Sequence, residues 1–347
     1  MSETTSPADT HPLVDGTVAP GCKKVDPIVV ADNVVRQFGG LTAVDVEHVE
    51  IPRGAITALI GPNGAGKTTF FNLLTGFDRP SKGTWSFEGQ SLAHVPSHKV
   101  ARRGMVRTFQ LTKSLGRLTV LQNMLLGARD QRGESIFAAL VKPLWKAQEA
   151  ANIERADSLL ARFKLDTKRE DYAASLSGGQ RKLLEMARAL MSEPTLVMLD
   201  EPMAGVNPAL TQSLLDHVRG LKDDGMTVLF VEHDMHMVRH ISDWVIVMAE
   251  GRIVAEGPPE TIMHDQAVVD AYLGAHHDTD LGTLTGQQVA QIHEDAEGEV
   301  PIDADAGPRR DTDVPDASAT TRTDASTTPP TDAHGATTET DPQEGQR

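Results

Sequence analysis

A run of glycines followed by a lysine and two threonines carries the clearest chemistry in this chain. It reads Gly61-Pro62-Asn63-Gly64-Ala65-Gly66-Lys67-Thr68-Thr69 and matches the pattern G-x-x-x-x-G-K-[ST]. Glycines let consecutive backbone N–H groups turn inward around a phosphate, and the start of a following helix adds a positive dipole end. We expect Lys67 to reach the β- and γ-phosphates of a nucleotide and the Thr68 hydroxyl to ligate Mg²⁺. An accidental glycine-rich turn is the alternative, and the flanking strand and helix patterns disfavour it.

Two adjacent acids form the second chemical signal. Asp200 and Glu201 follow the apolar run Leu196-Val197-Met198-Leu199. Buried, unpaired carboxylates are costly, so we expect both at the carboxyl end of a strand, where α/β proteins bind ligands. Asp200 is then predicted to hold Mg²⁺ through water, and Glu201 to polarise an attacking water as a general base. An acid that only caps the next element is the alternative, which the phosphate loop in the same chain disfavours.

A third run, Leu176-Ser177-Gly178-Gly179-Gln180, leads directly into an amphipathic helix predicted over residues 181–190. A serine hydroxyl and glycine N–H groups at a helix start can bind a second anion. Alone, this run is an ordinary entry to a helix. Because it lies twenty residues before the paired acids, we interpret it as a second phosphate-binding surface.

The elements around these motifs alternate between strands and helices. Continuous apolar runs predict buried strands at residues 55–60, 196–199, 228–231 and 245–248, and shorter strands at 28–30 and 43–46. Residues 68–74 are predicted as a helix, and residues 111–175 have helical spacing with no strong strand. The sequence therefore predicts an α/β fold in which a mainly parallel sheet carries a helical insertion.

Composition excludes several classes of protein. The 347 residues include no apolar stretch of the roughly 18 residues that a membrane span needs, which argues against a channel or a self-contained transporter. The acidic start carries no secretory signal pattern, and the single Cys22 cannot form an internal disulfide. We therefore expect a soluble protein in a reducing cytoplasm.

The formal net charge of −16 is concentrated at one end. Residues 276–347 hold 16 acidic and 4 basic residues and no Phe, Trp or Tyr, whereas the preceding 275 residues hold 33 acidic and 29 basic ones. So few apolar groups cannot offset the entropy of ordering, which predicts a disordered acidic tail over 276–347. Residues 1–25 are polar and are predicted as a disordered leader. No part of the body is strongly basic, so we expect no nucleic-acid binding.

The combined order of the three motifs resembles that of the ATP-binding-cassette (ABC) ATPases. The resemblance covers about residues 26–275. It implies a nucleotide-binding domain of the P-loop NTPase type, with an antiparallel β subdomain and a helical subdomain over about 111–190. It also implies that ATP and Mg²⁺ are the ligands, and that two copies bind head to tail. Each ATP would lie between the phosphate loop of one copy and the Ser177–Gln180 run of the other.

Further residues take roles only through this resemblance. Gln110 resembles the glutamine that senses Mg²⁺ and the γ-phosphate, and His233 resembles the switch histidine that contacts the γ-phosphate and positions water. Phe38 stands where the family stacks an aromatic ring on adenine, and Asn207 replaces a common aspartate. The implied catalytic residues are Glu201, His233, Lys67 and Gln110; the implied metal ligands are Thr68, Gln110 and Asp200; the implied nucleotide contacts are Phe38, Gly61, Asn63, Gly64, Ala65, Gly66, Lys67, Thr68, Thr69, Ser177, Gly178, Gly179, Gln180 and Asn207.

A finer resemblance points to the ATPases of branched-chain amino acid importers. It is carried by Glu201-Pro202-Met203-Ala204-Gly205-Val206-Asn207-Pro208, by Phe38-Gly39-Gly40-Leu41, by Glu232-His233-Asp234-Met235 and by Ala271-Tyr272-Leu273-Gly274. Urea and lipopolysaccharide-export ATPases share parts of this pattern and remain alternatives, as does a soluble ABC switch protein that does not transport. Import implies separate transmembrane permease subunits and a second ATPase, either identical or related. It also implies an external substrate-binding protein as an indirect partner, and a position on the inner face of the membrane.

Overall fold

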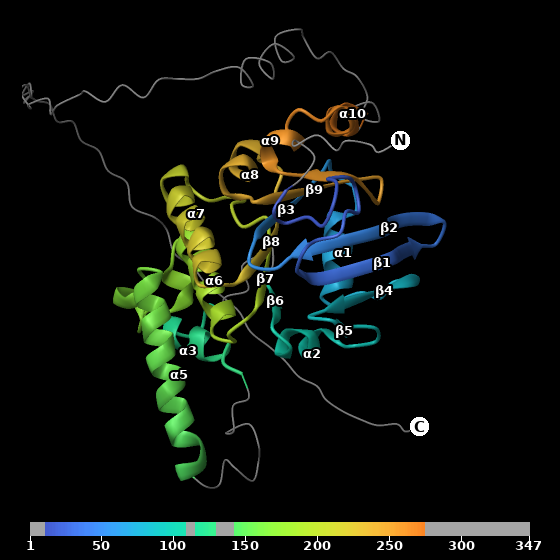
Figure 1. The fold of residues 1–347 in the computed structure, drawn as a ribbon. Helices are drawn as coiled ribbons and strands as arrows, with labels where there is room; N and C mark the ends of the chain where they lie inside the picture. Colours follow the sequence, from blue (N-terminus) through green and yellow to red (C-terminus); the bar gives the residue numbers. More distant parts are fainter. Residues whose placement is uncertain (1–10, 109–114, 130–141, 275–347) are drawn as a thin grey trace, which may run out of the picture. The chain divides into compact units, whose positions relative to one another are not determined.

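The computed structural model describes residues 11–108, 115–129 and 142–274, which lie within one compact unit of the chain. Gln110, residues 1–10 of the predicted leader and the predicted acidic tail over 276–347 lie outside the described residues. Among the residues described, no helix combines the length and the apolar character that crossing a membrane requires. Two sheets organise the unit (Figure 1).

The central sheet has six strands, five of them parallel. Its order is β10-β9-β3-β8-β7-β6, and only β10 runs antiparallel to its neighbour. The strands are β3 (Ile56–Ile60), β6 (Met105–Arg107), β7 (Leu196–Asp200), β8 (Thr227–Val231), β9 (Trp244–Ala249) and β10 (Arg252–Gly257). All five residues of β3, of β7 and of β8 are buried, because both faces of the sheet are covered. The predicted parallel core is confirmed.

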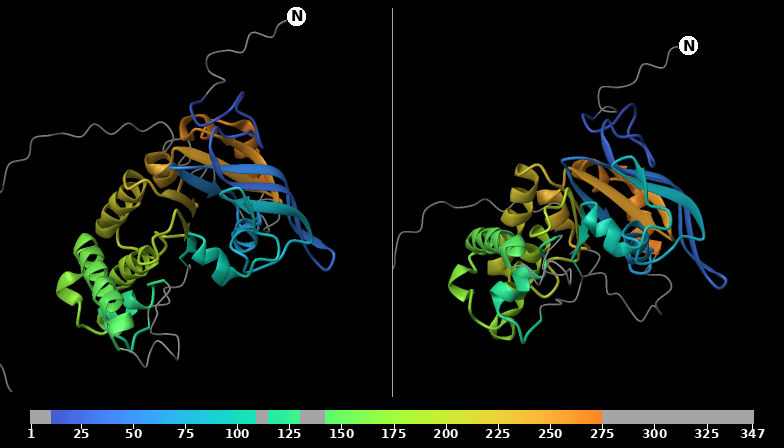
Figure 2. Two further views of the ribbon diagram at one scale, coloured as in Figure 1. Left: turned by 60° about the horizontal axis from the view of Figure 1, so that its bottom comes forward. Right: turned by 90° about the horizontal axis from the view of Figure 1, so that it is seen from below.

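Alternate side chains of the central strands enter two separate hydrophobic clusters. Ile56 and Ile60 of β3 belong to the cluster that includes residues of α3, α5, α6, α7 and α8, whereas Leu59 belongs to the cluster that includes α1 and the second sheet. Figures 1 and 2 show these groups on opposite sides of the central sheet. The helices are α1 (Lys67–Leu74), α2 (Ser97–Arg102), α3 (Val120–Leu125), α5 (Lys142–Arg162), α6 (Gly178–Leu190), α7 (Pro208–Asp223), α8 (Met235–Ile241), α9 (Pro259–Ile262) and α10 (Gln266–Gly274).

The second sheet is antiparallel, with the order β2-β1-β4-β5. Its strands are β1 (Pro27–Phe38), β2 (Leu41–Pro52), β4 (Lys82–Phe87) and β5 (Gln90–Ser91). The apolar runs at 28–30 and 43–46 are thus parts of two twelve-residue strands. The rest of β1 is mostly partly buried or exposed, and in β2 the polar residues Glu47, His48 and Glu50 hid the strand pattern although residues 49–52 are buried. Strands β4 and β6 were not predicted, because the first half of β4 is exposed and β6 has only three residues.

Residues of the predicted insertion pack as a helical group. Thr119 caps α3 through a reciprocal pair of hydrogen bonds with Gln122, so this short helix has a defined start. Two short 3₁₀ turns, η3 (Asp166–Lys168) and η4 (Ala173–Ser175), connect α5 to α6. Val120, Leu160 and Leu183, from three different helices, share one hydrophobic cluster. Together with the antiparallel sheet, this group gives the subdivided ABC-type fold that the resemblance implied.

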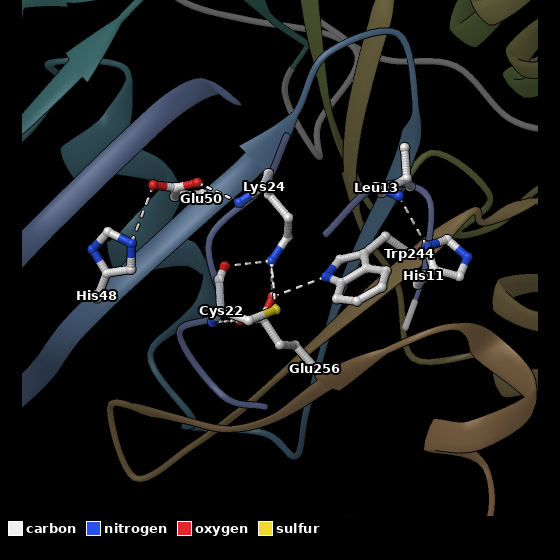
Figure 3. Close-up of polar contacts among 8 residues, drawn as sticks. All are labelled: His11, Leu13, Cys22, Lys24, His48, Glu50, Trp244 and Glu256. Atoms are coloured by element: carbon white, nitrogen blue, oxygen red, sulfur yellow. Dashed lines mark hydrogen bonds and ion pairs between the residues drawn. The ribbon is translucent and has the colours of Figure 1, made fainter. Parts of the chain in front are cut away.

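Residues 11–25 differ from the expected disordered leader, because their polar side chains bond into the body (Figure 3). The fully buried Lys24 ammonium lies 2.8 Å from a carboxylate oxygen of the equally buried Glu256 in β10. The same carboxylate accepts the Trp244 indole N–H and the Cys22 backbone N–H, both at 2.9 Å. Polarity alone suggested disorder, but paired charges are tolerated in the interior when each is satisfied.

Candidate nucleotide-binding site

The glycine-rich run forms a tight turn between β3 and α1, and neighbouring backbone presses against it. A Cβ atom at Gly61 would lie 1.9 Å from the carbonyl oxygen of Met248, and one at Gly66 would lie 2.3 Å from that of Ala43. Gly66 also has a φ of +96°, which side-chain-bearing residues rarely adopt. These two positions therefore require glycine for space as well as for conformation, and the loop is fixed by strands β9 and β2.

Lys67 begins α1 and folds back over its own loop. Its ammonium donates hydrogen bonds to the carbonyl oxygens of Gly61 at 2.6 Å and Pro62 at 2.9 Å. Burial lowers the pKa of Lys67, while the charges of Glu201 and Asp200 raise it. Strands β3 and β7 both lie parallel beside β8, so the phosphate loop and the paired acids follow the same edge of the sheet, near enough for the acids' charges to act on Lys67.

Asp200 ends β7 and is 5% exposed. One of its carboxylate oxygens lies 2.6 Å from the Arg107 guanidinium, which also donates to the Asn72 side chain at 2.6 Å. Arg107 ends β6, the strand beside β7. Arg107 received no role from the sequence. Its position three residues before Gln110 and its charge at the end of a strand could have indicated that it belongs to the site.

Glu201 follows β7 with a φ of +46°, in the left-handed region, and its N–H donates to the Val231 carbonyl at 3.0 Å. At the end of the adjacent β8, Glu232 is 2% exposed, while the side chain of the next residue, His233, is 65% exposed. Burial raises the pKa of Glu232, and the hydrogen bond from the Met203 N–H opposes that rise. A buried acid and an exposed histidine thus flank the catalytic candidate.

The predicted second anion site lies at the start of α6. The Ser177 hydroxyl accepts the Gln180 N–H at 3.2 Å, and the Gln180 side chain accepts the Ser177 N–H at 3.0 Å. Ser177 and Gly178 are exposed. The run is therefore an ordered surface turn that a second molecule can reach.

Two more candidates are also accessible. Phe38, at the end of β1, is 48% exposed, and the Arg36 guanidinium lies 4.3 Å from the centre of its ring. Asn207 is exposed just before α7, and its carbonyl accepts the N–H groups of Leu210 and Thr211. Thr68 is exposed within α1. Of the candidates assigned from the sequence, only Gln110 lies outside the described residues.

Comparison with known proteins places these features in a family. Residues 45–204 match the ABC transporter family, and residues 252–278 match the family described as branched-chain amino acid ATP-binding cassette transporter. A probable branched-chain amino acid transport ATP-binding protein, LivG, of Archaeoglobus fulgidus is 43% identical over 248 residues, covering 72% of this chain and 96% of the relative. This chain is an ABC transporter ATPase. The predicted family, fold class and ATP-hydrolysing activity are thereby confirmed.

Other relatives of the ABC ATPase agree. The high-affinity branched-chain amino acid transport ATP-binding protein BraF of Pseudomonas aeruginosa is 38% identical over 250 residues, covering 72% of this chain and 98% of the relative. Among solved structures, a nucleotide-free ATP-binding cassette from an ABC transporter superposes with a TM-score of 0.62 at 36% identity, covering 71% of this chain and 98% of that one. The ADP conformation of the cassette MJ1267 gives the same TM-score and identity, covering 72% and 99%.

Proposed function

We propose that this ABC ATPase drives the import of branched-chain amino acids through a separate membrane permease. The observation that carries the site assignment is that the phosphate loop and the paired acids follow parallel strands at the same edge of the sheet, where the charges of Glu201 and Asp200 act on Lys67. The match of residues 252–278 to the branched-chain family, and the names of the relatives, favour this substrate class over urea or lipopolysaccharide.

ATP binding needs Lys67 to exchange partners. Its ammonium now bonds two carbonyl oxygens of its own loop, and in the ATP complex we expect it to bond the β- and γ-phosphates instead. We expect backbone N–H groups of residues 63–69 to supply further donors, and the half-exposed ring of Phe38 offers a stacking surface for adenine. Because the loop is already fixed by Ala43 and Met248, little backbone ordering is left for ATP to impose.

The donor set suits Mg²⁺. The Asp200 carboxylate and the Thr68 hydroxyl are hard oxygen ligands, the class that Mg²⁺ prefers, and the site lies beside the phosphate loop. When bound, Mg²⁺ neutralises negative charge on the β- and γ-phosphates. The Arg107 guanidinium that pairs with Asp200 in the protein alone would have to share or release that carboxylate.

Hydrolysis is an in-line attack of water on the γ-phosphate. We assign Glu201 to orient and polarise the water, His233 to contact the γ-phosphate, and Gln110 to sense it. The αL backbone of Glu201 and its N–H bond to Val231 fix where the side chain leaves the strand. The His233 side chain is exposed rather than packed in the interior, so it can turn toward ATP.

A second ATPase, identical or related, completes each site. The start of α6 bears an ordered but exposed anion-binding turn, which suits an ATP held on another copy. Asn207 is exposed six residues after Glu201 and can form hydrogen bonds across that interface. ATP would then close the pair, and hydrolysis would release it.

The permease has a candidate docking groove beside the sheet. A cavity of about 360 Å³ lies between the end of β6 and the helical group, where Leu126 is 55% exposed. Its lining includes Val106, Thr108, Leu126, Gly127, Arg188 and Ser192. Thr108 in this lining stands two residues before Gln110 in the sequence. A permease element seated in the groove would hold this chain on the inner face of the membrane.

Reconstitution with its permease tests the proposal. Vesicles that hold the permease, this ATPase and an external binding protein should accumulate leucine when ATP is supplied on the ATPase side. Glu201→Gln should abolish uptake, while Glu47→Gln, an exposed matched change on β2, should not. ATP-driven uptake of urea but not leucine, or no association with any permease, would contradict the proposed function.

A further inference from the structure

The six residues after β7, Glu201 to Val206, form a segment that we call the catalytic loop. Its backbone is held by a lysine from a different part of the fold. The Lys182 ammonium of α6 donates to the carbonyl oxygens of Glu201 at 3.3 Å, Pro202 at 2.9 Å and Ala204 at 2.5 Å. An ammonium has three N–H donors, so all of them are directed at this one loop.

A buried carboxylate binds the same loop through a backbone N–H group rather than through carbonyl groups. Glu232, at the end of β8, accepts the Met203 N–H at 3.0 Å. The loop therefore gives three carbonyl groups to a cation and one N–H group to an anion. Burial lowers the pKa of Lys182, and the negative charge of Glu232 opposes that fall.

Lys182 belongs to the helix that starts with the second anion-binding turn. Only one residue separates it from Gln180, so a shift of this end of α6 moves the lysine and the three carbonyl groups bonded to it. The catalytic loop starts at Glu201 and ends next to Asn207. A small cavity of about 20 Å³ lined by Lys182, Asp200 and Glu201 shows that the lysine stem also borders the strand-end acids.

We propose that Lys182 and Glu232 are positioning residues for ATP hydrolysis, forming a clamp that transmits the position of α6 to the catalytic loop. The inference rests on the proposed roles of Glu201 and of the Ser177–Gln180 run. Binding of ATP to that run, from the second copy, shifts or steadies the start of α6. Through the clamp, the same event fixes the backbone from which the Glu201 side chain extends. A shift of about 1 Å in a catalytic group is enough to change a rate by about 100-fold.

Two substitutions of Lys182 test the clamp. Lys182→Met removes the charge and the donors but keeps an unbranched stem, whereas Lys182→Arg keeps charge and donors. We expect Lys182→Met to lower kcat for ATP by about 10-fold or more while KM and ATP affinity change less than about threefold, and Lys182→Arg to recover much of the loss. Lys222→Met is the matched control, because Lys222 pairs with Asp243 outside the catalytic loop.

Hydrogen–deuterium exchange of the full chain without nucleotide provides a readout that needs no turnover. Lys182→Met should speed exchange in residues 201–206 and leave α1 unchanged, whereas Lys222→Met should leave both unchanged. Unchanged exchange in the loop, or parental kcat in Lys182→Met, would overturn the clamp. So would an equal fall in kcat and in ATP affinity, which would indicate general damage. If the parent itself fails to hydrolyse ATP, the proposed function is wrong. Hydrogen–deuterium exchange in residues 201–206 still tests the clamp in that case.

Discussion

The phosphate loop and the catalytic loop, to which we assign ATP binding and ATP hydrolysis, are built in different ways. The phosphate loop owes its shape to its own glycines and to backbone atoms of Met248 and Ala43 that leave no room for side chains. The catalytic loop is held by charged side chains from α6 and β8. Local backbone constraint gives a rigid cradle for phosphates, whereas distant charged contacts let another part of the molecule adjust the position of Glu201.

The largest effect is expected from filling the phosphate loop. Gly66→Ala places a methyl group 2.3 Å from the Ala43 carbonyl oxygen, so the loop must shift. We expect ATP affinity to fall by about 100-fold, because several phosphate hydrogen bonds depend on the loop backbone. Gly89→Ala is the control, since Gly89 has a φ of +71° but open space around it. Titration with a fluorescent ATP analogue measures both; equal affinities would contradict the rigid cradle.

The next effect concerns the buried charges at the ends of β6 and β7. Arg107→Met removes the partner of a carboxylate that is 5% exposed. We expect the free energy of unfolding to fall by about 3 kcal/mol, because an uncompensated buried charge remains. Arg36→Met breaks the more exposed pair with Asp78 and should cost less than about 1 kcal/mol. Urea unfolding of both single variants and of Arg107→Met/Asp200→Asn measures these free energies. Equal losses of stability in the two single variants would show that the ends of β6 and β7 do not depend on the buried ion pair.

A smaller effect belongs to the adenine contact. Phe38→Ala removes the ring that we expect to stack on the base, and a stacking contact is worth about 1–3 kcal/mol, so ATP affinity should fall by about 10-fold. Phe38→Tyr keeps an aromatic surface and should bind as the parent does. Unchanged affinity in Phe38→Ala would remove this residue from the site.

The smallest effect is a change in pH dependence. Burial raises the pKa of Glu232, which faces Lys182 of α6, Glu201 of the catalytic loop and the neighbouring His233. Its carboxylate therefore takes up a proton at a higher pH than an ordinary glutamate as the solution is acidified, and the clamp loses its negative charge. Glu232→Gln lacks that charge at every pH. We expect the parent to exceed the variant in kcat by about threefold at pH 8 and to approach it on the acid side; a constant ratio would contradict this role.

The two loops also differ in how far the sequence predicts them. The phosphate loop, the strand-end acids and the turn before α6 were all located from short runs of residues, because each feature depends on backbone conformation and on neighbours in the chain. The six central strands were mostly predicted for the same reason: runs such as 55–60 and 228–231 can only be buried on both faces.

Contacts between distant residues could not be predicted. Nothing in the sequence around Lys182 shows that its ammonium reaches carbonyl groups about twenty residues later, and nothing around Lys24 shows that Glu256 neutralises it. For the same reason the leader was predicted as disordered over its whole length, although residues 11–25 pack into the body. Charged residues are normally exposed, so composition gives no sign of those that tertiary structure pairs.

ATP turnover by the purified chain, with and without Glu201→Gln, tests the central claim most directly. The parent should hydrolyse ATP, alone or with its permease and partner ATPase. The variant should keep ATP affinity, lose turnover and elute as an ATP- and Mg²⁺-dependent dimer in size-exclusion chromatography, because binding and closure precede the step that Glu201 performs. A variant that hydrolyses ATP at the parental rate, in the presence of the same partners, would contradict the assignment of Glu201 and with it the account of this site.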